Sequence, residues 1–302
     1  MDETQHGRRT ARCAGWASPA AYQKKDAGEP SASAVRRSLD AGLQSLYDSC
    51  PSSIDCLAYD DLNKAEKLHL HRSVVKLRLG SVNVGSLLKR SSEVAEMVGR
   101  RQLDFCCVQE CKWKGQGARF LEGDGVRYKF FWAGCKEGTA GVGIMIAEKW
   151  IDKVVEVKRI SARLMMLRIT VGDKIVNVVS AYAPQVGRSY SEKEEFWDSM
   201  MDLVTGVGDE ESIFIGGDLN GHVGQDVDGF EGTHGGNGYE KRNLEREMIL
   251  EFARAMEMVV CNTLFKKEER KKVTYESGGN KSEVDYFMVR KLDKKIVKML
   301  RL

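Results

Sequence analysis

The stretch IFIGGDLNGH, from Ile213 to His222, decides the fold. Its apolar start predicts a buried strand, and the glycines and polar residues that follow predict a ligand site at the carboxyl end of that strand. Because side chains alternate along a strand, we expect Asp218 and Asn220 to point to the same side. One acceptor or base beside one neutral donor suits a water nucleophile and a phosphate oxygen.

The composition is that of an ordinary folded protein. The chain has 302 residues, of which 42% are hydrophobic and 30% charged, with a net charge of +3. This length allows one large domain with an appendage. The small net charge does not by itself predict a nucleic-acid partner.

Targeting signals are missing from the sequence pattern. No apolar run approaches a membrane span, and no apolar stretch follows the basic N-terminus. We therefore expect an intracellular protein, nuclear or cytoplasmic, that is not secreted and has no membrane partner. The eight cysteines are scattered, and Cys106, Cys107 and Cys111 fit no zinc spacing, so reduced thiols are expected.

The chain divides into two regions. Residues 1–75 hold three of the four prolines and predict a poorly ordered N-terminal extension, with short helices at 33–48 and 59–70. Residues 76–302 predict one domain of strands and helices. Strands are predicted at 74–84, 103–109, 128–133, 141–147, 154–160, 164–171, 174–182, 213–218, 258–262 and 284–289, and helices at 91–101, 191–204 and 244–256.

The helix at 191–204 has Ser191 as its predicted N-cap, with Glu194 in the capping-box position. A glycine-rich and flexible loop is predicted at 221–238. Many strands with short connections favour an α/β class in layers, a sandwich rather than a doubly wound parallel sheet.

Polar residues follow the apolar runs of five predicted strands. These residues are Asn83, Glu110, Tyr182, Asp218 with Asn220, and Asp285. Strands normally end in polar turns, so each residue alone also fits an ordinary cap or turn. Their recurrence on separate strands favours a shared site.

The segments that contain these residues resemble those of a known superfamily. The ordered segments SVNV (81–84), VQE (108–110), AYAP (181–184), GDLN (217–220) and SEVDY (282–286) resemble the endonuclease/exonuclease/phosphatase superfamily, above all the apurinic-type endonuclease domains of non-LTR retrotransposons. NGHVG (220–224) and CNTLF (261–265) resemble the retrotransposon-derived craniofacial development protein 2-like group. The resemblance covers the chain from Leu77 onward. It implies a four-layered α/β sandwich, with two packed, mainly antiparallel β-sheets flanked by helices.

The resemblance also implies a metal site and a reaction. Glu110 is similar to the metal-binding glutamate of the superfamily, and Asn83 to the asparagine that supports the metal. The implied cofactor is Mg²⁺, or Mn²⁺, which takes oxygen ligands and needs few protein carboxylates. The implied reaction is metal-dependent hydrolysis of a phosphodiester, with DNA as the substrate and no obligate protein partner.

Four further residues receive catalytic roles from the resemblance. Asp218 resembles the aspartate that orients or deprotonates the attacking water, and Asn220 would hold that water or a phosphate oxygen. Tyr182 resembles the tyrosine that donates to the phosphate. Asp285 resembles the aspartate that orients the catalytic histidine of the superfamily.

Substrate contacts are a weaker expectation. His222 lies in the glycine-rich loop and is a candidate substrate ligand. Lys112 and Lys114 follow the Glu110 strand, where basic residues alternate with aromatic ones up to Lys129. This alternation fits either a nucleic-acid backbone contact or a solvated charged face.

The sequence departs from the pattern of the superfamily at two places. Gly85 stands where an aspartate is common, and no histidine follows His234, although the superfamily ends in a histidine-bearing strand. We therefore expect a C-terminally truncated domain that lacks its last strand and leaves a sheet edge unpaired. Three functions stay open: an active endonuclease, an inactive nucleic-acid-binding remnant, and a phosphatase of the same superfamily.

Overall fold

The computed structural model describes residues 75–123, 125–239, 245–277 and 280–298. The predicted helices at 33–48 and 59–70 lie outside the described residues, as does nearly all of the predicted extension.

The first sheet has five strands in the order β1-β2-β5-β4-β3. β1 and β2 are parallel, and all other neighbours in this sheet are antiparallel. The strands are β1 (Leu79–Asn83), β2 (Phe105–Gln109), β3 (Gln116–Gly123), β4 (Val126–Ala133) and β5 (Val142–Ala147).

The second sheet has six strands in the order β10-β13-β9-β8-β7-β6. Only β8 and β9 run parallel to each other. The strands are β6 (Val154–Ser161), β7 (Leu164–Val171), β8 (Lys174–Tyr182), β9 (Ser212–Asp218), β10 (Met258–Val260) and β13 (Asp285–Arg290), and a separate hairpin is made by β11 (Tyr275–Ser277) and β12 (Asn280–Ser282).

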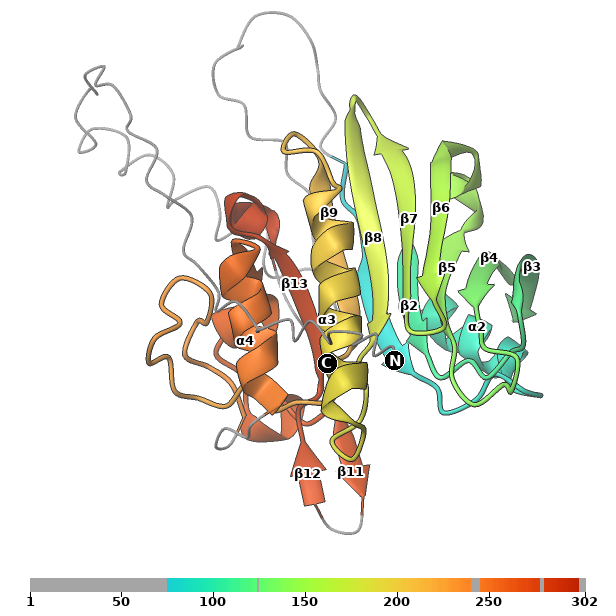
Figure 1. Cartoon of the computed structure of the whole chain (residues 1–302). Coiled ribbons are helices and arrows are strands. Elements are labelled where there is room, and N and C mark those ends of the chain that lie inside the picture. The colour runs from blue at the N-terminus through green and yellow to red at the C-terminus, as the bar shows by residue number, and fades with distance from the viewer. Residues whose placement is uncertain (1–74, 124, 240–244, 278–279, 299–302) are drawn as a thin grey trace, which may run out of the picture. The chain divides into compact units, whose positions relative to one another are not determined.

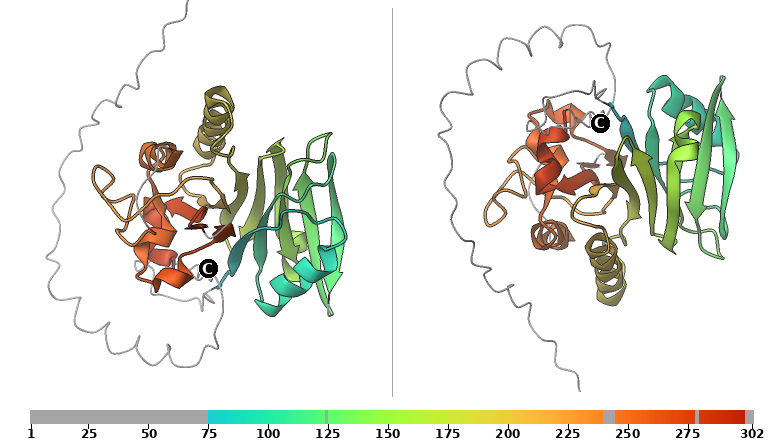
Figure 2. Two further views of the ribbon diagram at one scale, coloured as in Figure 1. Left: turned by 90° about the horizontal axis from the view of Figure 1, so that it is seen from below. Right: turned by 90° about the horizontal axis from the view of Figure 1, so that it is seen from above.

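Helices cover the outer faces of the two sheets (Figures 1 and 2). α2 (Ser91–Arg100) packs Val94 and Val98 on the five-stranded sheet, while α3 (Tyr190–Thr205) and α4 (Glu245–Ala255) pack on the six-stranded sheet. Short 3-10 helices complete the domain, namely η2 (Glu148–Lys153), η3 (Cys261–Leu264), η4 (Glu269–Lys271) and η5 (Lys291–Ile296). The predicted four-layered α/β sandwich is confirmed.

The β9 segment explains how the layers are held together. All its residues are buried, and Phe214 faces the core between the sheets whereas Ile213 and Ile215 face the helices. This alternation is the period of a strand buried on both faces. Gly217 is required by close packing, since a Cβ there would lie 2.0 Å from the carbonyl oxygen of Ala181.

Some predicted boundaries were wrong. α3 is capped by Ser189, whose hydroxyl accepts from the backbone N–H of Glu192 in a complete capping box, two residues before the predicted Ser191 and Glu194. β1 starts at Leu79 rather than at residue 74, and the strand predicted at 258–262 ends at Val260 and continues as η3.

The glycine-rich segment at 221–238 forms no helix or strand but is packed onto the domain. His234 is buried and its Nε2 lies 3.0 Å from the carbonyl oxygen of Gly224, while its Nδ1 accepts from the N–H of Gly236 at 3.0 Å. These contacts give the segment a defined path beside the site.

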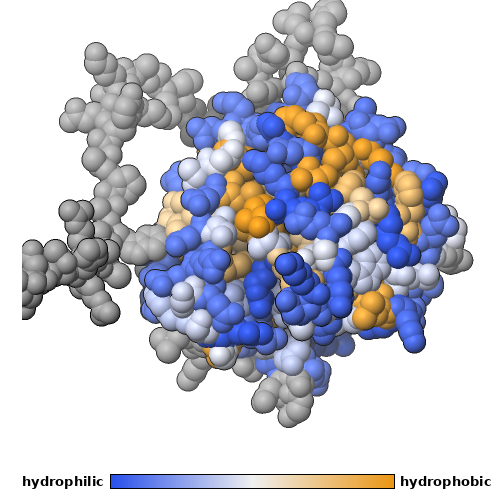
Figure 3. Space-filling model, turned by 45° about the vertical axis from the view of Figure 1, so that its right-hand side comes forward, coloured by the Kyte–Doolittle hydropathy of each residue, from blue (hydrophilic) through white to orange (hydrophobic). Residues whose placement is uncertain are grey.

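The surface in Figure 3 is mainly hydrophilic, with hydrophobic residues gathered in the upper half of this face. β6, the outer strand of its sheet, exposes Val155 and Ile160 but also the charged Lys158, and charged side chains on an edge strand disfavour pairing with another chain. In the part of the chain that the structure describes, no helix is long and apolar enough to cross a membrane.

Candidate active site

The polar residues at the strand ends meet at one edge of the sandwich. Asn83 ends β1, Glu110 follows β2, and Tyr182 and Asp218 end the parallel strands β8 and β9. Asp285 begins β13, which runs antiparallel to β9, so its start lies beside the end of β9. Tyr182 and Asp218 occupy the same register position, and Asp285 pairs with Asp218 from the other side.

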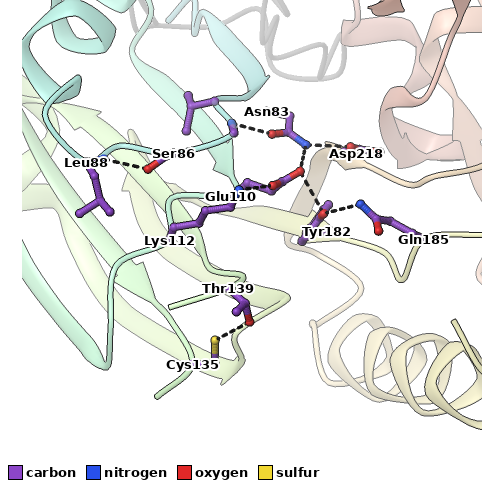
Figure 4. Close-up of polar contacts among 12 residues, drawn as sticks. Asn83, Ser86, Leu88, Glu110, Lys112, Cys135, Thr139, Tyr182, Gln185 and Asp218 are labelled. Carbon is purple, nitrogen blue, oxygen red and sulfur yellow. Dashed lines mark hydrogen bonds and ion pairs between the residues drawn. The ribbon is translucent and has the colours of Figure 1, made fainter. Parts of the chain in front are cut away.

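Asn83 connects the two sheets. Its Nδ2 donates to Oε1 of Glu110 at 2.9 Å and to Oδ2 of Asp218 at 3.0 Å (Figure 4). Its Oδ1 accepts from the backbone N–H of Gly85 at 2.9 Å, which fixes the orientation of the amide. One side-chain amide therefore holds a carboxylate of each sheet at a defined separation.

Glu110 is surrounded by donors. The hydroxyl of Tyr182 donates to Oε1 at 3.0 Å, and Nζ of Lys112 lies 3.1 Å from Oε2 (Figure 4). Glu110 and Lys112 have φ values of 53° and 55°, a left-handed conformation that residues with a side chain seldom adopt and that clusters at functional sites. This backbone turns the carboxylate and the ammonium toward each other directly after β2.

The two carboxylates have pKa values displaced in opposite directions. Burial acts to raise the pKa of Glu110, but hydrogen bonds from Asn83, Lys112 and Tyr182 together lower it below its usual value. Burial raises the pKa of Asp218, the hydrogen bonds from Asn83 and Asn220 oppose this, and the charge of Glu110 adds to the increase. Such divergence is typical of pairs that perform different tasks in catalysis.

Asn220 lies just beyond the strand. Its φ is 50°, its backbone N–H donates to Oδ1 of Asp218 at 3.0 Å, and its Nδ2 donates to the carbonyl oxygen of Ala183 at 2.9 Å. β9 ends at Asp218, so Asn220 lies outside the extended geometry that the sequence predicted for both residues. A left-handed turn nevertheless keeps Asn220 at the same cavity.

A cavity of about 930 Å³ joins most of the predicted site residues. Six of them line it, namely Asn83, Glu110, Asp218, Asn220, His222 and Asp285. Tyr182 and Lys112 do not line it but contact Glu110. Lys114 has an exposed side chain and is not part of the lining.

Sequence reasoning missed three polar residues that support the site. Gln109 is fully buried between the sheets, where its Nε2 lies 3.3 Å from the hydroxyl of Ser180 and its Oε1 accepts from Ser81 at 3.3 Å. A polar residue at the end of the apolar run FCCVQ was the available signal. Gln185, which lines the cavity, has its Nε2 3.4 Å from the hydroxyl of Tyr182.

Asn262 is the third of these supporting residues. Its Nδ2 donates to the carbonyl oxygen of Asp285 at 2.9 Å and to Oε1 of Glu283 at 3.0 Å, and its Oδ1 accepts from the N–H of Phe287 at 2.9 Å. The start of β13 is thereby held from the side of η3.

The donor set fits a hard cation. The residues described contain no group of three or more His, Cys, Asp or Glu side chains that could hold a metal. Asn83, Glu110 and Asp218 line one cavity, and Mg²⁺ is commonly bound by one or two carboxylates while keeping several waters.

The chain belongs to the Endonuclease/Exonuclease/phosphatase family, whose model matches residues 80–297. Among curated proteins it is similar to craniofacial development protein 2 of Bos taurus, with 24% identity over 216 residues, 70% of this chain and 36% of that protein. The chain thus spans about a third of the length of the curated relatives it matches. The predicted family and this relationship are confirmed.

Two solved structures share the fold. The AP endonuclease of Archaeoglobus fulgidus has 17% identity and a TM-score of 0.50, covering 72% of this chain and 88% of that one. The 3'-5' exonuclease NExo of Neisseria meningitidis has 15% identity and a TM-score of 0.50, with the same coverage. At these identities the likeness shows the sandwich architecture alone.

Proposed function

We propose that this chain is a nuclease that hydrolyses phosphodiester bonds in DNA with a divalent cation, Mg²⁺ or Mn²⁺. The observation that carries the proposal is the bridge from Asn83 to both Glu110 and Asp218 over one cavity. Two carboxylates with opposite pKa displacements, held by a neutral donor, suit metal binding on one side and water activation on the other.

Glu110 and Asn83 would hold the cation. When bound, the ion would neutralise charge on the scissile phosphate and on the leaving oxygen. Because the pKa of Glu110 lies below its usual value, its carboxylate stays ionised at neutral pH and is available as a ligand.

Asp218 would orient the attacking water and accept its proton. A raised pKa makes its carboxylate a better base than an exposed aspartate. Tyr182 stays protonated, since burial and the charge of Glu110 raise its pKa, so its hydroxyl can donate to a phosphate oxygen. Asn220 would hold the water or a phosphate oxygen beside Asp218.

A second candidate function is binding of nucleic acid without cleavage. The observation that favours it is the ion pair of Lys112 with Glu110, which places a positive charge against the carboxylate that we propose as a metal ligand. The motifs shared with retrotransposon endonuclease domains support a retrotransposon origin under either function, and DNA as the partner supports an intracellular location.

The test is nicking of supercoiled plasmid by the full chain with Mg²⁺, Mn²⁺ or a chelator. We expect metal-dependent nicking that falls at least about 100-fold in Glu110→Gln and Asp218→Asn. Asp226→Asn, which removes an exposed carboxylate of the neighbouring segment, should nick normally. Salt-sensitive plasmid binding with nicking no faster than in Asp218→Asn would support the second function. Hydrolysis of p-nitrophenyl phosphate without nicking would show a phosphatase.

A further inference from the structure

Two tryptophans form an aromatic cluster on the outer face of the β3–β4 hairpin. The ring of Trp113 stands nearly perpendicular to that of Trp132, with centroids 5.0 Å apart, and to the buried Phe130 at 5.4 Å. The indole N–H of Trp132 donates to the carbonyl of Lys114 at 3.3 Å. A Cβ at Gly117 would lie 2.4 Å from the indole of Trp132, so glycine lets this ring lie on the backbone of β3. These contacts fix the orientation of both indoles.

The cluster stays open to solvent beside α2. Leu121 packs in the same core cluster as α2, and Arg119 shares its face because side chains alternate along β3. Arg119 is exposed, and Trp113 and Trp132 are partly exposed. The guanidinium carbon of Arg119 lies 4.9 Å from the ring centroid of Trp113, which is a cation–π contact. The two indoles and this guanidinium, here called the platform, are therefore accessible to a ligand.

The cations of the hairpin differ in whether a carboxylate compensates them. Arg127 points to the opposite face of β4 by alternation, and it pairs with Glu122 and with Glu148 at 3.1 Å each. Arg119 and the exposed Lys114 form no ion pair among the residues that the structure describes. The positive charge of the outer face is therefore available to an anionic ligand, whereas that of Arg127 is already compensated.

Aromatic faces beside uncompensated cations are the combination that binds single-stranded nucleic acid. Unstacked bases stack on indole and guanidinium planes, while the phosphates contact basic side chains. A duplex keeps its bases stacked inside and cannot use the platform in this way. Trp113 follows Glu110 by three residues, which span at most about 11 Å of chain. A strand that leaves the candidate active site can therefore reach the platform.

We propose that the platform, together with Lys114, binds single-stranded DNA. A base stacks on the platform, and the adjoining phosphates lie beside Arg119 and Lys114. The proposal rests on the proposed function in taking DNA as the ligand, and it narrows the substrate to DNA with an unpaired strand beside the cleaved bond. Binding at this face requires neither a metal ion nor hydrolysis.

The test is binding of a fluorescein-labelled oligothymidylate, about 12 nucleotides long, to the full chain in EDTA, followed by anisotropy. Trp113→Leu should bind it at least about fivefold more weakly, because stacking is lost. Arg119→Gln should bind it at least about threefold more weakly. Arg127→Gln removes the same amount of charge and should bind like the parent. A blunt DNA duplex of equal length should bind equally to the parent and to Trp113→Leu.

Four results would overturn the proposal. The oligothymidylate does not bind, or it binds equally to the parent and to Trp113→Leu. Arg119→Gln and Arg127→Gln weaken binding equally, which would show a general effect of charge. Trp113→Leu weakens binding of the duplex as much as that of the single strand, which would show contact with phosphates alone. An oligoglutamate peptide displaces the oligothymidylate at equal concentration, which would indicate an acidic peptide as the partner.

A second measurement uses the unchanged chain and covers the case in which Trp113→Leu does not fold. An oligothymidylate that carries 5-iodouracil, irradiated with the protein, should crosslink to Trp113 or Trp132, and crosslinks found only elsewhere would contradict the proposal. Plasmid nicking separates this inference from the proposed function. A chain that binds the oligothymidylate as expected but does not nick would refute the nuclease and leave the platform standing.

Discussion

The ammonium of Lys112 lies 3.1 Å from Oε2 of Glu110, the carboxylate that we propose as a metal ligand. A fixed positive charge at this distance opposes the binding of a divalent cation. We therefore expect Lys112→Met to bind Mn²⁺ about two- to tenfold more tightly at pH 7.5, as measured by electron paramagnetic resonance. The same change should weaken binding of DNA, because one cation near the phosphate is lost.

Lys114→Met is the control for this prediction. Its side chain is exposed and lies outside the cavity lining, so the affinity for Mn²⁺ should stay unchanged. Weaker metal binding in Lys112→Met would show that the lysine supports the metal ligand rather than competing with the ion.

Glu110→Gln should lower the pKa of Asp218. Burial is the main cause that raises this pKa, and the charge of Glu110 adds to it, so the neutral variant removes the second cause. A carboxyl whose folded pKa is raised makes the fold lose stability as the pH rises through that pKa. The variant should lose less stability over this pH window. A ¹³C NMR titration of the Asp218 carboxyl and urea unfolding at several pH values measure both effects, and an unchanged Asp218 pKa would contradict the coupling.

Gly217→Ala should destabilise the domain by about 3 kcal/mol or more. The added methyl would lie 2.0 Å from the carbonyl oxygen of Ala181, a backbone atom that cannot rotate away. Gly187→Ala is the matched change, since nothing lies within 4 Å of its Cβ position, and its free energy of unfolding should stay within about 0.5 kcal/mol. Urea unfolding of both variants measures these free energies. Similar losses of unfolding free energy in the two variants would mean that β8 and β9 pack less tightly at Gly217 than described.

Ser189→Ala should cost about 1 kcal/mol of unfolding free energy, because it removes the cap of α3. Ser191→Ala changes an exposed residue inside the helix and should be close to neutral. Thermal unfolding of the two variants distinguishes the observed cap from the one that the sequence predicted. A larger loss of unfolding free energy in Ser191→Ala than in Ser189→Ala would instead support Ser191 as the N-cap.

Strands and helices could be predicted from the sequence wherever the spacing of apolar residues matches the residues that are buried. In β9, Ile213 and Phe214 belong to an apolar run whose burial matches its strand pattern. β3 was missed because Leu121 is its only buried residue, so nothing in its periodicity marks a strand. Its pairing with β4 is a tertiary contact. The position of the α3 cap was missed because Ser189 and Ser191 both precede an acidic residue at the required spacing.

The sequence predicted most of the residues that form the site, but not the hydrogen bonds that connect them. Asp218 and Asn83 end strands that could be recognised separately, yet they are 135 residues apart and their hydrogen bond depends on how the sheets stack. The contact of Asn262 with the backbone of Asp285 leaves no local signal either, because both groups are ordinary in their own segments.

The amide of Asn83 has a consequence for the interior of the protein. Asn83 ends a strand of one sheet and donates to Asp218 at the end of a strand of the other sheet. The distance between the carboxylates of Glu110 and Asp218 is therefore set by the distance at which the two sheets pack. Buried residues between the sheets, such as Phe287 and Cys107, therefore help to set the separation of the two carboxylates. Trimming or enlarging them is expected to change the rate of reaction before it unfolds the chain.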